Sequence, residues 1–277
     1  MLKPTDLILS HYCLAAGPAE RFEAAARAGF AGVALSWDEL KAARAEDGNV
    51  NRMRRLLKDN RLAAPQLEYL TLPTAGTERA FLAEARDAAE TSAEMGCEVI
   101  LVLGTLDPAA PAQRVCDAFA MLAQTCGEMG MKCAIEFVPG VTAVPDLASA
   151  RRLVRAAASP SAGLLVDSLH FDRSDESWQE LEGLKPGQVL VIQINDGPLG
   201  PVGADYVEEC LGRRLLPGDG AFDLTRFVER LSVVAPAVPL SAEVINLDLQ
   251  RRYSAAELAQ RIAERTRALL VHRLKGT

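Results

Sequence analysis

Histidine is scarce in this 277-residue sequence, and the cysteines form no recognisable metal motif. Only three histidines occur, His11, His170 and His272, which is too few for a histidine-rich cluster of several zinc ions. The six cysteines include no CxxC pair and no zinc-finger spacing. We therefore expect reduced cysteines that mostly pack as small, buried hydrophobic residues.

Long apolar runs and an excess of positive charge are absent as well. No uninterrupted apolar stretch reaches the roughly 18–20 residues that a membrane helix needs, and the N-terminal residues do not form a signal peptide. The net charge is −7, so the overall field repels phosphate backbones. We expect a cytoplasmic protein that acts on a small molecule, with neither a nucleic acid nor a membrane as partner.

No linker-like segment divides the chain, and short apolar runs alternate with longer segments of helical periodicity. The predicted strands are residues 7–10, 32–36, 64–68, 99–103, 133–138, 163–168, 189–195 and 240–245. The run at 64–68 predicts the weakest strand because it is short and contains Pro65. The predicted helices are residues 18–28, 77–95, 112–129, 146–157, 223–233 and 254–271.

This regular alternation of strands and helices is typical of a closed (β/α)₈ barrel. The main alternative, an open doubly wound sheet, usually carries a GxGxxG turn after its first strand, and the sequence has no such turn there. We predict a single (β/α)₈ TIM-barrel domain over residues 1–277.

Three predicted strands carry a carboxylate near their C-terminal end, and a fourth carries an amide. The four residues are Glu136, Asp167, Gln193 and Glu243. Because side chains alternate along a strand, the residues two positions earlier would share the same inward face; these are Ala134, Leu165, Val191 and Ser241. The four oxygen-bearing side chains should therefore meet at the mouth of the barrel, where active sites of this fold lie.

Carboxylates that lie this close together repel one another unless a cation sits among them. A set made only of oxygen donors favours Mn²⁺ or Mg²⁺, with Co²⁺ or Zn²⁺ as alternatives. We predict one divalent metal ion held by the four residues. In the competing interpretation, each acid pairs separately with an arginine or lysine of the barrel.

Five further side chains fall near the predicted mouth. His170 follows Asp167 by three residues and can reach the substrate or orient a glutamate. Arg214 stands in a loop rich in glycine and proline and can clamp a hydroxyl, carboxylate or phosphate. His11, Trp37 and Glu68 fall at the ends of the first three predicted strands and are candidate substrate-binding residues. Each has an ordinary alternative role in packing or in an ion pair.

The order of these motifs along the chain resembles the xylose-isomerase-like barrel superfamily. The matching elements are Glu136, the Asp-Ser-Leu-His sequence at 167–170, Gln193 with Asn195 and Asp196, Arg214 with the Pro-Gly-Asp-Gly sequence at 217–220, and Glu243. The sequence is most similar to the sugar phosphate isomerase/epimerase group, which includes ketose 3-epimerases, inosose isomerases and dehydratases, and 3-dehydroshikimate dehydratases. Barrels of this group are often homo-oligomers, so a homo-oligomer is also expected.

The resemblance implies one catalytic divalent metal bound by Glu136, Asp167, Gln193 and Glu243. The third ligand of the family is usually histidine. The glutamine found here resembles the ligand set of some bacterial 3-dehydroshikimate dehydratases.

A metal that holds two neighbouring oxygens of an α-hydroxyketone stabilises the enediolate formed when the α-proton leaves. If Glu136 and Glu243 approach from different sides, one can remove the proton and the other can return it. We therefore predict a metal-dependent isomerase or epimerase acting on a ketose, keto-inositol or related polyol, with Glu136, Glu243 and His170 as catalytic residues. If a β-hydroxyl is expelled instead, the enzyme is a dehydratase acting on 3-dehydroshikimate or a similar cyclic keto acid.

Three other functions are disfavoured. An endonuclease that acts at abasic sites, a relative on this barrel, needs a histidine-rich zinc cluster. Xylose isomerase itself needs a second metal site, whose carboxylates and lysine we cannot locate in the sequence. A non-catalytic sugar-binding barrel would have no use for a complete set of metal ligands.

Overall fold

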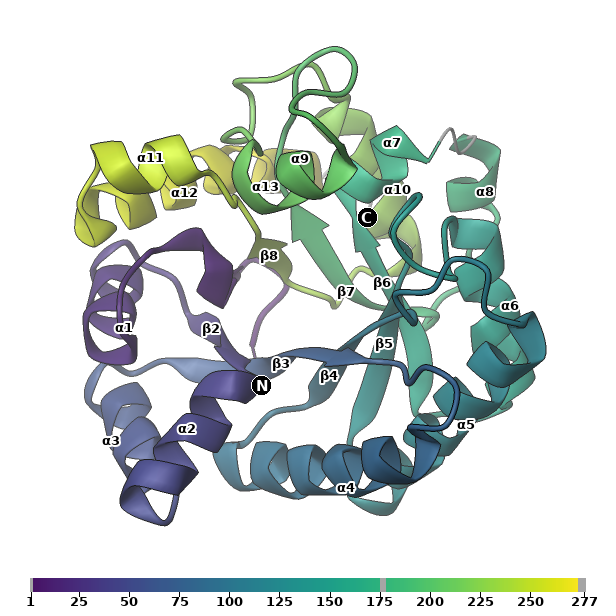
Figure 1. Ribbon diagram of the computed structural model, residues 1–277. Helices are drawn as coiled ribbons and strands as arrows, with labels where there is room; N and C mark the ends of the chain where they lie inside the picture. The colour runs from purple at the N-terminus through teal and green to yellow at the C-terminus, as the bar shows by residue number, and fades with distance from the viewer. Residues whose placement is uncertain (1, 175–177, 274–277) are drawn as a thin grey trace.

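The computed structural model describes residues 2–174 and 178–273. Eight parallel strands close into a barrel in the order of the chain, and Figure 1 shows helices on all sides of these strands. The strands are β1 (Leu7–Leu9), β2 (Gly32–Ser36), β3 (Ala63–Thr71), β4 (Val99–Leu103), β5 (Lys132–Glu136), β6 (Ala162–Asp167), β7 (Val189–Ile194) and β8 (Leu240–Ala242). The predicted (β/α)₈ barrel is confirmed.

Helices connect and cover the strands. They are the 3₁₀ helix η1 (His11–Cys13), α1 (Pro18–Arg27), α2 (Trp37–Asp47), α3 (Asn51–Asp59), α4 (Glu78–Met95), α5 (Ala112–Glu128), α6 (Leu147–Ala157), α7 (Ser168–Arg173), α8 (Trp178–Glu182), α9 (Tyr206–Gly212), α10 (Leu224–Val234), α11 (Leu247–Arg252), α12 (Ala255–Ala268) and α13 (Leu270–Arg273). None of the helices in the described part of the chain has the length and apolar character needed to cross a membrane.

Capping residues mark one end of several of the longer helices. Asp146 and Ser254 each close a capping box at the start of α6 and α12, which satisfies backbone N–H groups that have no partner inside the helix. Helix α4 ends at Gly96, whose φ of +80° is readily adopted only by a residue without a side chain. All six cysteines are free, and only Cys116 is partly exposed, as expected.

The strand predicted to be weakest is in fact the longest. Strand β3 runs over nine residues, Ala63–Thr71. Its ladder with β2 is irregular between Gly32 and Ala34, opposite Pro65, and an irregular ladder accommodates a residue that has no N–H to donate. Strands β5 and β8 end earlier than predicted, at Glu136 and Ala242.

A layer of small and medium-sized side chains fills the barrel beneath its mouth. Leu101, Ala134, Leu165 and Val191 pack together there, and Ser241 donates a hydrogen bond of 3.2 Å to Gln66 inside the barrel. The predicted inward face is therefore confirmed. Two residues further along β5, β6 and β7, the same face presents the predicted metal ligands.

Candidate active site

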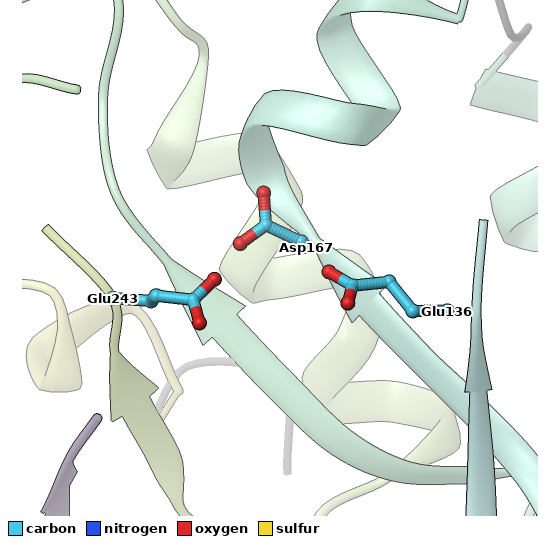
Figure 2. Close-up of side chains that lie close together, drawn as sticks. All are labelled: Glu136, Asp167 and Glu243. Atoms are coloured by element: carbon cyan, nitrogen blue, oxygen red, sulfur yellow. The ribbon is translucent and has the colours of Figure 1, made fainter. Parts of the chain in front are cut away.

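Three carboxylates from separate strand ends meet at the mouth of the barrel. Glu136 and Asp167 are the last residues of β5 and β6, and Glu243 directly follows β8. One oxygen from each side chain lies within 4.8 Å of the others, and all three residues are buried. Figure 2 shows the three carboxylates pointing toward one another. This acidic triad could hold a metal ion.

Four hydrogen-bond donors fix the carboxylate of Asp167. Its Oδ1 accepts from the backbone N–H groups of Leu169 and His170, at 2.7 and 3.2 Å, because Asp167 is the N-cap of α7. Its Oδ2 accepts from Asn195 Nδ2 at 2.8 Å and from Arg214 Nη1 at 3.1 Å. The first turn of α7 and the end of β7 together orient this ligand.

Arg214 forms ion pairs with two carboxylates of the acidic triad and also lines the cavity. Its Nη1 is 2.7 Å from Glu243 Oε2 and also contacts Asp167, while its Nε donates to the carbonyl of Cys210 at 2.8 Å. Nη2 makes no hydrogen bond to the described part of the chain, and Arg214 lines the cavity above the triad. Two of the three carboxylates share one guanidinium. The competing interpretation, in which each acid pairs with its own arginine or lysine, therefore does not describe this site.

Burial and mutual repulsion make the two glutamates retain protons. Burial raises the pKa of Glu136 well above its ordinary value, and the charge of Asp167 raises it further. Burial also raises the pKa of Glu243 to about 8, although Arg214 opposes this shift. Without a further cation, Glu136 and Glu243 therefore hold their protons to a higher pH than an ordinary glutamate does.

Tyr69 joins the fourth predicted ligand to the triad. Gln193 Nε2 donates to the Tyr69 hydroxyl at 2.7 Å, and this hydroxyl donates to Glu243 Oε1 at 2.9 Å. Gln193 Oε1 is buried and has no hydrogen-bond partner among the described residues. A buried oxygen left without a donor is costly.

Glu136 has a similarly unsatisfied oxygen. His170 Nε2 lies 3.2 Å from Glu136 Oε1, within ion-pair distance, but the two groups are not aligned for a hydrogen bond, and Oε1 has no hydrogen-bond partner within residues 2–174 and 178–273. The orphaned oxygens of Glu136 and Gln193, together with the carboxylates of Asp167 and Glu243, match the hard, oxygen-only donor set of a divalent cation.

His170 is held between the triad and α9. Its Nδ1 lies 2.5 Å from the hydroxyl of Tyr206, and its Nε2 faces Glu136. The side chain is buried and lines the cavity. Its position fits the predicted role of orienting a glutamate or reaching the substrate.

A cavity of about 390 Å³ opens above the triad. We call its charged base the floor; the floor consists of Glu136, His170, Arg214 and Glu243. The remaining lining comes from Tyr69 of β3, from the last residue of β4, and from the segments that follow β1, β4, β5, β7 and β8. The cavity therefore stands where this fold places active sites.

The other predicted substrate-binding residues do not line this cavity. Glu68 Oε2 accepts hydrogen bonds from Ser10 Oγ at 3.0 Å and from the backbone N–H of His11 at 3.2 Å, and it lies 2.9 Å from His11 Nδ1. Ser10 Oγ is also 3.4 Å from Glu243 Oε1, so this group lies beside the triad. Trp37 begins α2, where it is buried and donates its indole N–H to a glutamate of α4.

The prediction that Trp37 binds substrate is wrong, because this residue does not line the cavity. A helix begins directly after β2 and turns the indole toward α4.

The sequence analysis also missed Tyr69 and Tyr206. Tyr69 directly follows Glu68, and regular alternation would point the two side chains to opposite faces. The ladder between β3 and β4 shifts register between Leu67 and Leu70, next to both residues. The sequence pattern does not predict that shift.

The family of the chain follows from comparison with known proteins. The family model described as "Xylose isomerase-like TIM barrel" matches residues 22–269. The chain belongs to this family. Its members include isomerases, epimerases and dehydratases, so membership indicates an enzyme and leaves the reaction class open.

Two curated relatives and one solved structure illustrate the likeness. A 3-dehydroshikimate dehydratase of Pseudomonas aeruginosa is 28% identical over 82% of this chain, and one of Pseudomonas putida is 25% identical over 91%. The matched parts are only 36% and 39% of those longer relatives. The structure of the IolI protein with a bound zinc atom has a TM-score of 0.86 at 17% identity, covering 96% of this chain and 98% of that one.

The raised pKa of Glu243 predicts how the stability of the metal-free protein depends on pH. Between the ordinary value of 4.5 and about 8, the folded protein keeps a proton that the unfolded chain has lost. Unfolding then releases a proton, so stability falls as pH rises, by up to about 1.4 kcal/mol per pH unit for one proton. Urea unfolding from about pH 5 to about pH 8 measures this slope.

Glu243→Gln should flatten the slope, whereas Glu264→Gln, on the exposed side of α12, should leave it unchanged. Mn²⁺ should stabilise the protein more at the upper end of this range, because the ligands bind metal as carboxylates. A stability that rises with pH in metal-free wild-type protein would contradict the shift.

Proposed function

We propose that this protein is a divalent-metal-dependent isomerase or epimerase that moves a proton at a carbon next to a ketone, through an enediolate intermediate. The α-hydroxyketone unit of ketoses, keto-inositols and related polyols offers such a carbon. The observation that carries the proposal is the meeting of three buried carboxylates at the barrel mouth, two of which line a single cavity. A buried amide oxygen without a hydrogen-bond partner among the described residues belongs to Gln193, which is joined to the triad through Tyr69.

Glu136, Asp167, Gln193 and Glu243 would hold the metal ion. Their oxygen-only donor set favours Mn²⁺ or Mg²⁺ over ions that prefer sulfur or imidazole. When bound, the divalent cation supplies Lewis-acid stabilisation of negative charge on substrate oxygen. Arg214 already neutralises part of the triad and can direct its free Nη2 toward one oxygen of the substrate.

Glu136 and Glu243 are suited to transfer the proton. They come from opposite parts of the barrel wall, β5 and the end of β8, and both line the cavity. Each carboxylate can accept a proton from a carbon of a substrate in the cavity and return it. Removal by one and return by the other on the opposite face of the carbon inverts that carbon, which is epimerisation. His170 faces Glu136 and can exchange a proton with it.

A dehydratase is the second candidate. Both curated relatives are named 3-dehydroshikimate dehydratase, and the amide of Gln193 at the third ligand position resembles the ligand set of some of these enzymes. On this alternative, the same base removes the α-proton and a hydroxyl leaves from the neighbouring carbon of a cyclic keto acid.

The two candidates are separated by products. Mn²⁺-loaded protein is incubated in D₂O with a panel of ketoses, inososes and 3-dehydroshikimate. An epimer or isomer that carries deuterium at the α-carbon, detected by NMR, supports the first candidate. Absorbance of an aromatic dihydroxybenzoate without any epimer would instead establish the dehydratase.

Glu243→Gln should lower turnover in this assay at least about 100-fold, because it removes a base and a metal charge together. The fold should persist, since the change keeps the size of the side chain, and circular dichroism checks this. Glu264→Gln on α12 is the matched control and should keep full activity. Normal turnover in Glu243→Gln would show that the site is elsewhere.

Gln193→His should keep metal binding but shift its preference toward Zn²⁺ or Co²⁺, because imidazole is a softer ligand than an amide oxygen. Competition between Mn²⁺ and Zn²⁺, followed by calorimetry, measures the shift. Gln260→His, on the exposed side of α12, controls for adventitious binding by an added histidine. Unchanged selectivity in Gln193→His would mean that Gln193 is not a ligand.

A further inference from the structure

The side walls of the cavity are apolar, in contrast to its charged floor. We call this lining the apolar wall; it consists of Leu106, Val138, Val141, Val207, Leu211 and Ile245. These residues come from four different connections, those after β4, β5, β7 and β8.

Several members of the apolar wall remain exposed. The exposed fraction is 60% for Leu106, 54% for Leu211 and 44% for Val207. Large apolar side chains gathered around a concave site commonly mark the place where an apolar ligand is bound. A ligand seated above the triad would remove these three side chains from water.

Two of the hydroxyl groups among the walls are already engaged, whereas that of Tyr12 has no hydrogen bond to the described residues. The hydroxyl of Thr142 donates to the carbonyl of Val144 and accepts from its N–H, and the hydroxyl of Tyr69 is shared between Gln193 and Glu243. A substrate hydroxyl placed against the apolar wall would lose its water partners without gaining protein partners, which is unfavourable.

An aromatic surface continues the wall on the side of β1. Tyr12 and Tyr69 both line the cavity, and their rings are stacked at an angle of 25° with centroids 6.2 Å apart. Tyr12 remains 40% exposed. A flat, unsaturated ligand can stack against such a surface.

Positive charge is limited to the floor. Among the described residues that line the cavity, Arg214 is the one arginine or lysine, and two of its three nitrogens are engaged. A single free nitrogen can bind one oxygen of a carboxylate or hydroxyl. The cavity of about 390 Å³ falls within the range of about 300–1,000 Å³ that is typical of small-molecule pockets.

We propose that the substrate is an unphosphorylated hydroxyketone or keto acid whose oxygens face the floor and whose remaining body is a flat, largely apolar ring packed against the apolar wall. This inference rests on the proposed function for the chemistry at the floor, and it narrows the substrate class away from open-chain polyols. The charged floor recognises the reacting group, and the apolar wall selects what is attached to it.

Three commercial probes that share one reacting group test this selection. Hydroxyacetone carries the hydroxyketone alone, L-erythrulose adds further hydroxyls without closing into a ring, and 2-hydroxyacetophenone adds a phenyl ring. Calorimetric titration of Mn²⁺-loaded protein should show 2-hydroxyacetophenone binding at least tenfold more tightly than L-erythrulose. Equal affinity, tighter binding of L-erythrulose, or no binding of 2-hydroxyacetophenone up to its solubility limit would overturn the proposal.

Substitutions in the apolar wall test whether its side chains cause the preference for 2-hydroxyacetophenone. Leu106→Asn and Leu211→Asn, at exposed positions that tolerate a polar side chain, should each reduce the ratio of the two affinities at least threefold without changing the affinity for Mn²⁺. Leu199→Asn is the matched control, because Leu199 is 94% exposed and does not line the cavity. A ratio that neither wall substitution changes would also overturn the proposal.

The same titrations distinguish a failure of the proposed function from a failure of the proposed substrate class. Absence of Mn²⁺ binding by the wild-type protein would contradict the proposed function, while the ratio of the two affinities, measured in the same protein, would still decide on the apolar wall. Mn²⁺ binding with no preference for the phenyl ligand would contradict the substrate class alone.

Discussion

The concentration of negative charge at the mouth of the barrel is the constraint on which the site depends. Burying three carboxylates within 4.8 Å of one another is unfavourable unless opposite charge and hydrogen bonds accompany them. Asp167 receives four donors and Glu243 receives Arg214, whereas Glu136 is left with an oxygen that no described donor satisfies. The proposed metal ion would correct this imbalance, and without it the buried oxygen of Glu136 lowers the stability of the fold.

Much of the site could be predicted because it depends only on the alternation of side chains along each strand and on the closure of the strands into a barrel. Parallel strands in a barrel all end on one rim, so acids at equivalent strand ends must meet there. Glu136, Asp167 and Glu243 illustrate this, since each position follows from the alternation of a single strand. Gln193 could be placed by the same reasoning, and the structure joins it to Glu243 through one hydroxyl.

The rest could not be predicted because it depends on irregular backbone. Tyr69 reaches the triad where β3 shifts register against β4, and Trp37 leaves the mouth because α2 begins without a loop. Helix α9 has only seven residues, too few for a periodic pattern to stand out from a loop. Such features arise from tertiary packing, and a single sequence carries no local signal for them.

Helix α9 shows how substrate selection and chemistry are coupled in this cavity. Val207 and Leu211 belong to the apolar wall, while Tyr206 contacts His170 and the carbonyl of Cys210 accepts from Arg214. The helix thus presents one face to the cavity and holds two floor residues with another. Changes that displace α9 as a whole will also move the floor, whereas a side-chain substitution of similar size, such as Leu211→Asn, alters the wall alone. Leu106, which follows β4, makes no such connection in the described residues, so the connection after β4 can vary with the substrate while the chemistry at the floor stays the same.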